Sequence, residues 1–253
     1  MSLESFSLHG KVAIVTGCDT GLGQGMALGL AQAGCDIIGI NRVPPQATVA
    51  GVTALGRRFL SLEADLSQQE ALPALMAQAV AEFGHIDILV NNAGIIRRQD
   101  ALAFSEQDWD DVINLNAKTV FFLSQLAARQ FIAQGQGGKI INIASMLSFQ
   151  GGIRVPSYTA SKSAVLGLTR LMANEWAQHG INVNAIAPGY MATNNTRQLR
   201  DDPERSQEIL QRIPAGRWGE PADLAGPVVF LASSAADYIN GHTLAVDGGW
   251  LAR

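Results

Sequence analysis

Short apolar runs alternate with longer amphipathic stretches along almost the whole chain. Seven runs are apolar at nearly every position, at residues 12–16, 36–41, 58–62, 86–90, 139–143, 181–187 and 243–246. Strands that helices cover on both faces have this pattern, whereas strands with one face exposed to solvent alternate apolar and polar residues. The runs therefore predict the strands of a parallel sheet.

The stretches between these runs have apolar residues at helical spacing. The clearest are residues 22–33, 72–83, 109–133, 158–178 and 221–231. Alternation of buried strands with such helices is typical of repeated βαβ units. No Pro-, Gly- or Ser-rich linker and no charge block divides them, so residues 1–253 are predicted to form one α/β domain.

Residues 190–218 are the least regular part of the chain. They include Asn-Asn-Thr and Asp-Asp-Pro segments as well as Pro214 and Gly216. A loop this long inside a compact α/β domain commonly forms a lid or a binding element. The segment therefore predicts a substrate-binding lid, with a surface helical hairpin as the structural alternative.

Composition excludes several classes of protein. Apolar residues make up 47% of the chain and charged residues 16%, which predicts a large core and some subunit interface. The net charge of −4 offers no basic footprint for nucleic acid or an anionic membrane. No apolar stretch approaches the roughly 18 residues of a membrane span.

Cysteine and histidine usage predicts a cytoplasmic protein without a metal. Cys18 and Cys35 are too few for a disulfide framework, and Cys35 precedes an apolar run and is expected to be buried. The N-terminal sequence MSLESFSLHGK lacks the pattern of a signal peptide. The four histidines have no metal-ligand spacing.

A glycine-rich turn follows the first predicted strand. Its sequence is Gly17-Cys18-Asp19-Thr20-Gly21-Leu22-Gly23, and a predicted helix starts within it. Glycines let the backbone approach a pyrophosphate, and free N–H groups at a helix start attract its negative charge. The spacing differs from the G-x-G-x-x-G dinucleotide fingerprint. The turn predicts a phosphate-binding loop, with a plain strand-to-helix turn as the alternative.

The end of the second predicted strand bears on the choice of dinucleotide. An acidic residue there binds the adenosine ribose hydroxyls, whereas a cation favours a 2′-phosphate. This chain has Asn41 followed by Arg42. Asn41 can hydrogen-bond a ribose hydroxyl, and Arg42 is compatible with either cofactor. Because Asp19 in the loop repels further negative charge, we predict NAD.

Tyr158 and Lys162 lie one helical turn apart on one face of a predicted helix. A phenol has a pKa of about 10, and a neighbouring ammonium lowers that pKa, as general acid–base catalysis requires. Ser145 follows the fifth predicted strand, at the sheet edge where doubly wound folds bind ligands. These residues predict an acid–base site, with a helix-surface pair as the alternative for Tyr158 and Lys162.

Together these motifs resemble the short-chain dehydrogenase/reductase family. The resemblance covers the whole chain in order and rests on Thr16-Gly17, Gly21-Leu22-Gly23, Asp65-Leu66, Asn91-Asn92-Ala93-Gly94, Asn116, Ser145, Tyr158, Lys162 and Pro188-Gly189. It implies a single Rossmann-like domain, with seven parallel strands and helices on both faces, that assembles into a homotetramer. It also implies hydride transfer between a nicotinamide cofactor and a secondary alcohol or ketone.

The resemblance further implies a role for each motif. Tyr158 would be the acid–base residue, Lys162 would lower its pKa and hold the nicotinamide ribose, and Ser145 would orient the substrate carbonyl. Asn116 would hold a water that links Lys162 to solvent, with a helix cap or kink as the alternative. Cofactor contacts are implied for Asp65, Leu66, Asn92, Ala93, Gly94, Pro188, Gly189 and Thr193.

Three arginines are candidate ligands for a substrate carboxylate. Arg97 and Arg98 follow the NNAG segment, which by the resemblance ends beside the nicotinamide, and Arg154 lies four residues before Tyr158. Arginine binds carboxylates through charge-assisted, often bidentate hydrogen bonds. The alternative is pairing with Asp100, Glu106 or Asp108 on the surface. Gln150, Met191 and Trp218 are further candidates for the substrate wall, with simple packing as their alternative.

Longer segments narrow the resemblance to family members that act on six-carbon sugar acids. They are NNAGIIRR, NIASMLSFQGGIRVPSYTASK, APGYMATNNT and AVDGGWLAR. The likeness implies reversible hydride transfer between NAD(H) and a deoxy-keto sugar acid in pectin and hexuronate breakdown. The alternatives are a ketoreductase for acyl-carrier-protein thioesters or a gluconate 5-dehydrogenase, each with NADP(H), and a nucleotide sensor without catalysis. A hydrolase is disfavoured because no G-x-S-x-G motif is present.

Overall fold

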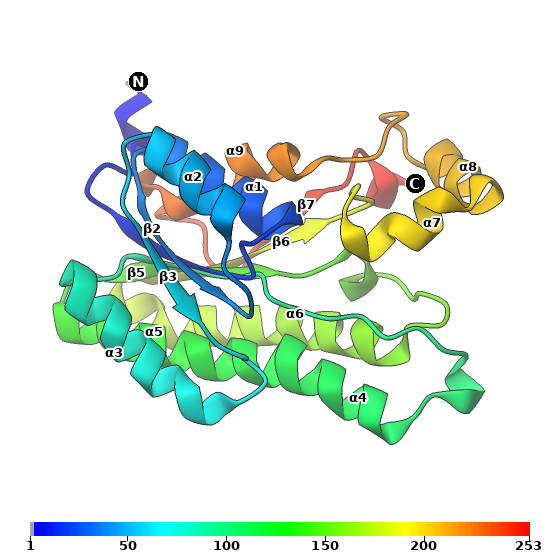
Figure 1. Cartoon of the computed structure of the whole chain (residues 1–253), viewed down its shortest axis with the longest axis horizontal. Coiled ribbons are helices and arrows are strands. Elements are labelled where there is room, and N and C mark those ends of the chain that lie inside the picture. The colour runs from blue at the N-terminus through cyan, green and yellow to red at the C-terminus, as the bar shows by residue number, and fades with distance from the viewer. Residues whose placement is uncertain (1–2) are drawn as a thin grey trace.

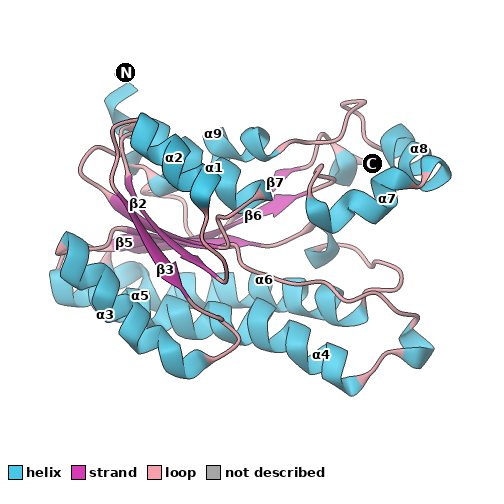
Figure 2. Ribbon diagram, in the orientation of Figure 1, coloured by secondary structure: helices cyan, strands magenta, loops and turns pink. Residues whose placement is uncertain are grey.

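The computed structural model describes residues 3–253, so the first two residues of the predicted domain lie outside the described part. Seven strands form one sheet with every neighbouring pair parallel, in the order β3-β2-β1-β4-β5-β6-β7 (Figures 1 and 2). Their bounds are β1 Val12–Thr16, β2 Asp36–Asn41, β3 Phe59–Glu63, β4 Ile88–Asn91, β5 Gly138–Ile143, β6 Ile181–Pro188 and β7 Thr243–Val246. The predicted fold class is confirmed.

Helices cover both faces of the sheet. One layer is formed by α1 (Gly21–Gln32), α2 (Gln46–Ala54) and α9 (Ala225–Ala232), and the other by α3 (Leu72–Phe83), α4 (Glu106–Ile113), α5 (Thr119–Gln134) and α6 (Pro156–Trp176) (Figure 1). Successive strand residues point to opposite faces, so Ala13 and Val15 pack in one core cluster and Val12 and Ile14 in the other. This is why the strands are apolar at nearly every position.

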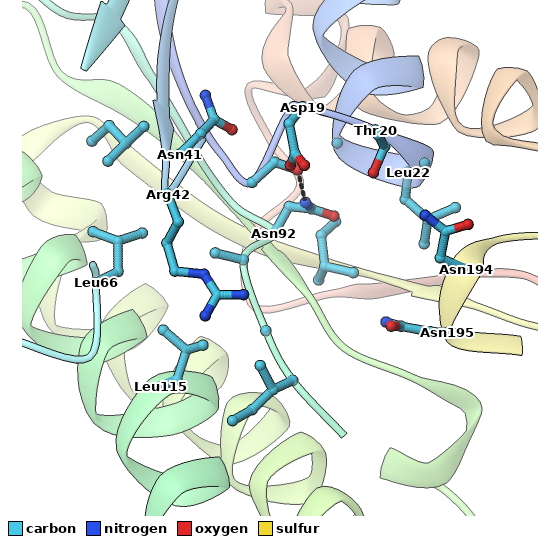
Figure 3. Close-up of a pocket in the computed structure, with 18 of the residues that line it drawn as sticks. Asp19, Thr20, Leu22, Asn41, Arg42, Leu66, Asn92, Leu115, Asn194 and Asn195 are labelled. Atoms are coloured by element: carbon cyan, nitrogen blue, oxygen red, sulfur yellow. Dashed lines mark hydrogen bonds between the residues drawn. The ribbon is translucent and has the colours of Figure 1, made fainter. Parts of the chain in front are cut away.

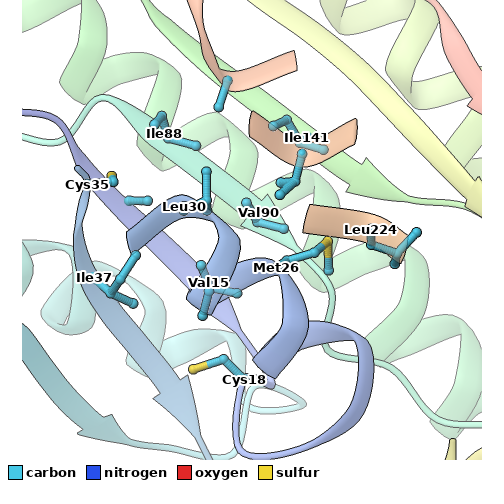
Figure 4. Close-up of a cluster of buried hydrophobic side chains, with 14 of the residues drawn as sticks. Val15, Cys18, Met26, Leu30, Cys35, Ile37, Ile88, Val90, Ile141 and Leu224 are labelled. Atoms are coloured by element: carbon cyan, nitrogen blue, oxygen red, sulfur yellow. The ribbon is translucent and has the colours of Figure 1, made fainter. Parts of the chain in front are cut away.

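The first core cluster joins α1 and α9 to the sheet (Figure 4). Met26 and Leu30 of α1 pack against Val15 and Val90, and all four side chains are fully buried. Cys35 belongs to the same cluster and is buried, as its apolar surroundings in the sequence predict. This layer holds the start of α1 against the carboxyl ends of β1 and β4.

Two helical features differ from the expected pattern. Helix α2 was not among the predicted helices, because its sequence QATVAGVTA has few large apolar residues and buries only Thr48 and Val52. The predicted helix 109–133 is α4 and α5 joined by one π-helical turn, Asn114–Lys118. Such turns bulge a continuous helix and are frequent at functional sites.

Residues 190–218 contain a short turn, Asn194–Thr196, followed by α7 (Arg197–Asp201) and α8 (Pro203–Arg212). In Figure 1 the two helices project beyond the carboxyl end of β6, away from the layers that cover the sheet. Helix α8 begins with Asp202, whose carboxylate accepts a hydrogen bond from the Arg205 N–H at 3.1 Å. The segment contains a pair of short helices, and within these two helices Ile209 is the buried residue.

Candidate active site

The glycine-rich turn is fastened to the NNAG segment. Gly17 and Gly21 have positive φ angles of 64° and 58°, which other residues rarely adopt. The Asn92 side chain donates hydrogen bonds to the carbonyls of Thr16 and Gly17 at 3.0 and 2.9 Å. A Cβ on Gly23 would overlap the Gly17 carbonyl and the Asn92 amide, so only glycine fits there. These contacts fix the start of α1 against β4.

A cavity of about 560 Å³ is lined by this turn and by the catalytic candidates Tyr158 and Lys162. Figure 3 shows residues that line it, among them Asp19 and Thr20 of the turn. Most predicted cofactor residues line it: Gly17, Asp19, Thr20, Gly21, Leu22, Gly23, Asn41, Asp65, Leu66, Asn92, Ala93, Gly94, Tyr158, Lys162 and Thr193. At one end Thr20 caps α1 without a side-chain hydrogen bond, which leaves N–H groups of the first turn open to an anion. The cavity therefore fits an elongated dinucleotide with its phosphates at α1.

Both residues at the end of β2, Asn41 and Arg42, line this cavity. Asn41 is buried, and its side-chain oxygen accepts a hydrogen bond from the Cys18 N–H at 2.7 Å. The Asn41 side chain therefore braces the glycine turn. Arg42 extends into the cavity beside Leu66 and Leu115 (Figure 3). The role of Asn41 as a ribose ligand stays a prediction, since Asn41 lines the cavity and its amide oxygen has a second lone pair.

The opposite end of the cavity holds the acid–base candidates. Lys162 is buried and donates a hydrogen bond to the Ile143 carbonyl at 2.6 Å. Its Nζ lies 5.7 Å from the centre of the Tyr158 ring. Ser145 is 8% exposed and hydrogen-bonds the Tyr158 hydroxyl. The end of β5 and the first turns of α6 thus bring all three residues together.

Burial governs the pKa values of both groups. The Tyr158 pKa lies above its usual value because burial disfavours the phenolate, while the hydrogen bond with Ser145 and the positive charge of Arg98 act in the opposite direction. Burial likewise lowers the pKa of Lys162 to about 8. The net direction for the Tyr158 pKa is opposite to the sequence-based expectation, since desolvation outweighs the Ser145 hydrogen bond and the Arg98 charge.

Asn116 lies in the π-helical turn and is completely buried. Its side-chain oxygen accepts a hydrogen bond from the Ile95 N–H, and its amide donates to the Ile95 carbonyl, both at 2.9 Å. The amide also contacts the Ser161 hydroxyl at 3.2 Å, and that hydroxyl donates to the Tyr158 carbonyl at 2.8 Å. Asn116 therefore joins the chain after NNAG to the helix of Tyr158 and Lys162.

The three candidate arginines have different partners. Arg97 pairs with Asp108 at 3.2 Å and Asp111 at 3.7 Å, and Arg154 pairs with Asp100 at 3.2 Å. Arg98 has no ion pair within residues 3–253, and its Nη2 donates to the Asn195 carbonyl at 2.8 Å. The positive charge of Arg98 also lowers the pKa of Tyr158. Only Arg98 therefore combines a free cationic charge with proximity to the acid–base group.

The remaining predicted residues lie outside the large cavity. Gln150 accepts a hydrogen bond from Arg212 at 3.3 Å, and the Trp218 ring packs edge-on against Tyr190. Gly189 and Met191 border a smaller cavity of about 170 Å³, and Pro188 ends β6 without lining either one.

Sequence reasoning passed over two residues at the site. Tyr190 is close enough to Tyr158 to raise the pKa of the latter, and Asn195 holds Arg98 through its carbonyl. Tyr190 directly follows the Pro-Gly motif, which was the available signal for it. The Asn195 contact uses the backbone and has no sequence signature.

Within residues 3–253 no group of three His, Cys, Asp or Glu side chains is arranged to hold a metal ion. No helix in that range has the length and apolarity needed to cross a membrane.

A strand-to-helix glycine turn and a Ser-Tyr-Lys site along one cavity define a class of nicotinamide-dependent oxidoreductase. A family model described as enoyl-(acyl carrier protein) reductase matches residues 17–251. The chain belongs to the short-chain dehydrogenase/reductase family, and it is an oxidoreductase that acts on CH–OH groups.

Curated relatives and solved structures match over nearly the whole chain. The chain is 79% identical to 2-dehydro-3-deoxy-D-gluconate 5-dehydrogenase of Escherichia coli K12 over 253 residues, which is 100% of both proteins. It is 75% identical to the protein of the same name from Dickeya dadantii, again over 100% of both. A crystal structure from Agrobacterium tumefaciens, described as a 2-deoxy-D-gluconate 3-dehydrogenase with bound NADP, superposes with a TM-score of 0.93 at 54% identity and covers 98% of this chain and 99% of that one.

Proposed function

We propose that this enzyme transfers hydride reversibly between a nicotinamide cofactor and the 5-position of 2-dehydro-3-deoxy-D-gluconate, or a closely similar deoxy-keto sugar acid, in pectin and hexuronate breakdown. The 79% identity to a curated enzyme of that name supports the substrate class. The observation within the site that carries the proposal is Arg98, a cation without an ion-pair partner in the described chain whose charge reaches Tyr158.

The acid–base roles follow from the contacts at the end of β5 and the start of α6. Tyr158 donates its hydroxyl proton to the alkoxide that develops when the ketone is reduced, and it accepts the proton back in oxidation. Ser145 hydrogen-bonds the same substrate oxygen, so two hydroxyls stabilise its developing charge. The bound dinucleotide supplies or accepts the hydride.

Lys162 and Asn116 support this proton transfer. A Lys162 ammonium beside the phenol favours phenolate, and it is held in place by the Ile143 carbonyl. Asn116 fixes the helix that carries both residues through Ser161. Its proposed role is to hold a water that connects Lys162 with solvent.

Arg98 binds the substrate carboxylate in this proposal. Its guanidinium offers up to five N–H donors, and one N–H is committed to Asn195. Arg97 and Arg154 already have carboxylate partners on the surface, so we assign the carboxylate to Arg98 alone. Gln150, Met191 and Trp218 shape the wall of the substrate site through packing and hydrogen bonds around residues 190–218, which act as the lid.

The cofactor is NAD(H) in this proposal, with limited discrimination against NADP(H). Asp19 and Arg42 both line the adenosine end of the cavity, and they act in opposite directions on a 2′-phosphate. Asn41 is uncharged, so it does not repel a 2′-phosphate as an acidic residue at this position would. The Agrobacterium tumefaciens structure, at 54% identity, has NADP bound, which supports weak discrimination between the two cofactors.

We also propose a cytoplasmic homotetramer. Phe122 and Ile132 on α5 and Leu171 on α6 are large apolar side chains that are 39%, 45% and 47% exposed. Burial between subunits would remove these side chains from water. Light scattering on the purified protein measures the assembly directly.

A steady-state comparison tests the substrate class. The wild type is assayed with NADH and NADPH on the keto sugar acid, on its neutral analogue without the carboxylate, and on a 3-oxoacyl thioester. We expect a strong preference for the acid and loss of turnover in Tyr158→Phe with cofactor binding retained. Faster reduction of the thioester would favour the acyl-carrier-protein ketoreductase instead.

A further inference from the structure

The lid formed by residues 190–218 is closed at its base. The Gly219 N–H donates to the Tyr190 carbonyl at 2.9 Å, and the Ala192 N–H donates to the Gly219 carbonyl at 2.7 Å. Met191 and Gly219 form an isolated parallel bridge at the same point. The two ends of the lid are therefore held to each other, and the position of the helices between them depends on what packs beneath.

The C-terminal residues pack beneath these helices. Trp250 is 4% exposed and shares a hydrophobic cluster with Ile209 of α8, with Ile213 just beyond it, and with Met146 next to Ser145. Tyr190, Leu199, Trp218 and Leu251 line the same cluster. One cluster thus joins both ends of the lid, its outer helix, the turn after Ser145 and the C-terminus.

Trp250 makes the two most specific contacts in this cluster. Its ring lies 4.8 Å from that of Tyr190 at an interplanar angle of 67°, and the Arg212 guanidinium lies 4.1 Å from the centre of a Trp250 ring. The carboxylate of Asp247 accepts hydrogen bonds from the N–H groups of Gly249 and Leu251, both at 2.9 Å, and so fixes the turn that presents Trp250. Edge-to-face aromatic pairs and cation–π contacts both have preferred geometries, so they restrict orientation as well as burial.

Tyr190 connects this arrangement with the reaction site. A second aromatic ring, that of Trp218, contacts Tyr190 at 5.7 Å and 77°. No hydrogen bond of the Tyr190 hydroxyl is found within residues 3–253, while its proximity to Tyr158 contributes to the raised pKa of that residue. The hydroxyl is thus an uncommitted donor and acceptor, on a ring that packs in the same cluster as Met146, the residue that follows Ser145.

We propose that the C-terminal turn, residues 247–252, is part of the substrate-binding apparatus. In this proposal Trp250 is a positioning residue: it sets the ring of Tyr190, whose hydroxyl contacts the bound substrate, and it ties that ring to α8 through Arg212. The proposal rests on the proposed function, because it assigns Tyr190 to the substrate of the same site.

Kinetics of Trp250 and Tyr190 variants test this assignment. We expect Trp250→Ala to raise the KM for the keto sugar acid at least tenfold while the KM for the cofactor stays within twofold. Trp250→Phe, which keeps an aromatic ring, should stay within about threefold of the wild type. Tyr190→Phe should reproduce the increase, and the double variant Tyr190→Phe/Trp250→Ala should be no worse than the more impaired single variant.

A variant that leaves the core intact distinguishes the positioning role from a loss of the fold. Arg212→Ala removes the guanidinium from the Trp250 ring without opening the core, and it should raise the KM for the acid about threefold or more. Arg205→Ala is the matched control, because Arg205 lies on the same helix and pairs only with Glu208, at 2.7 Å. Wild-type kinetics in Arg212→Ala together with Trp250→Ala would overturn the proposal, as would equal increases in the KM values for acid and cofactor.

Hydrogen exchange separates this proposal from the proposed function. The measurement needs no substrate: exchange in residues 190–218 should rise in Trp250→Ala and remain unchanged in Arg205→Ala. If the wild type reduces no sugar acid but exchange rises as expected, the substrate assignment fails and the positioning role of Trp250 stands. If the acid is reduced and exchange is unchanged, the positioning role fails alone.

Discussion

Replacing Arg98 by alanine tests the central feature of the proposed substrate site. The Arg98 side chain is exposed and has one hydrogen bond, to the Asn195 carbonyl at 2.8 Å, so its remaining N–H groups are available to a ligand. A hydrogen bond to a charged group contributes about 1.5–3 kcal/mol. Because solvent screens an exposed side chain, Arg98→Ala should cost about 2 kcal/mol of transition-state binding free energy. This corresponds to a decrease of about 30-fold in kcat/KM for the acid.

The neighbouring arginine provides a matched control. Arg97→Ala removes a surface pair with Asp108 and Asp111, which is worth about 0–1 kcal/mol, so kcat/KM should fall by no more than about fivefold. Both variants are assayed on the keto sugar acid and on its neutral analogue. The 30-fold loss should be confined to Arg98→Ala with the acid.

A second readout follows from the effect of Arg98 on Tyr158. The Arg98 charge lowers the Tyr158 pKa, so its removal should move the alkaline-rising limb of the oxidation rate to higher pH for acid and neutral substrates alike. Equal losses on both substrates with no change in their ratio would refute carboxylate binding. The acid–base assignment of Tyr158 would survive that result.

Three further predictions concern the cofactor, the π-helical turn and the buried lysine. Arg42→Ala should lower kcat/KM for NADPH about tenfold or more and change the value for NADH less than about threefold, because only NADPH has the 2′-phosphate; cofactor titrations measure this. Asn116→Ala should reduce stability by about 2–3 kcal/mol in chemical denaturation, since it leaves the buried Ile95 N–H and carbonyl unpaired. Between about pH 8 and pH 10.5 the folded protein binds fewer protons at Lys162 than the unfolded chain does. The Lys162 contribution to the free energy of unfolding should therefore increase with pH across that window. Chemical denaturation of Lys162→Met should show no such increase. If the unfolding free energy of the variant depends on pH as that of the wild type does, the lowered pKa of Lys162 is contradicted.

The sequence predicted most of the fold because the signal was local. Strands buried on both faces must be apolar at nearly every position, so all seven were found, with ends within a few residues of those in the structure. Helix α2 was missed because it buries few residues. The π-helical turn was missed because it adds only one residue to a continuous helix, and the spacing of apolar residues does not reveal so small a change.

The sequence by itself also determined which residue types meet at the carboxyl ends of the strands. The glycine turn, the NNAG segment, Ser145 and the Tyr158–Lys162 pair each follow or adjoin a predicted strand, and in a parallel sheet those ends share one edge. Their convergence on one cavity was therefore predictable from order along the chain.

Only the tertiary structure decided the direction and partners of individual side chains. Arg97 and Arg98 are adjacent in the sequence, yet one pairs with α4 and the other binds the carbonyl of Asn195. Asn41 faces the glycine turn, and Trp250 reaches Tyr190 from 60 positions away. Hydrogen bonds and ring contacts of this kind depend on which segments the fold brings within a few ångströms, and no local pattern specifies that.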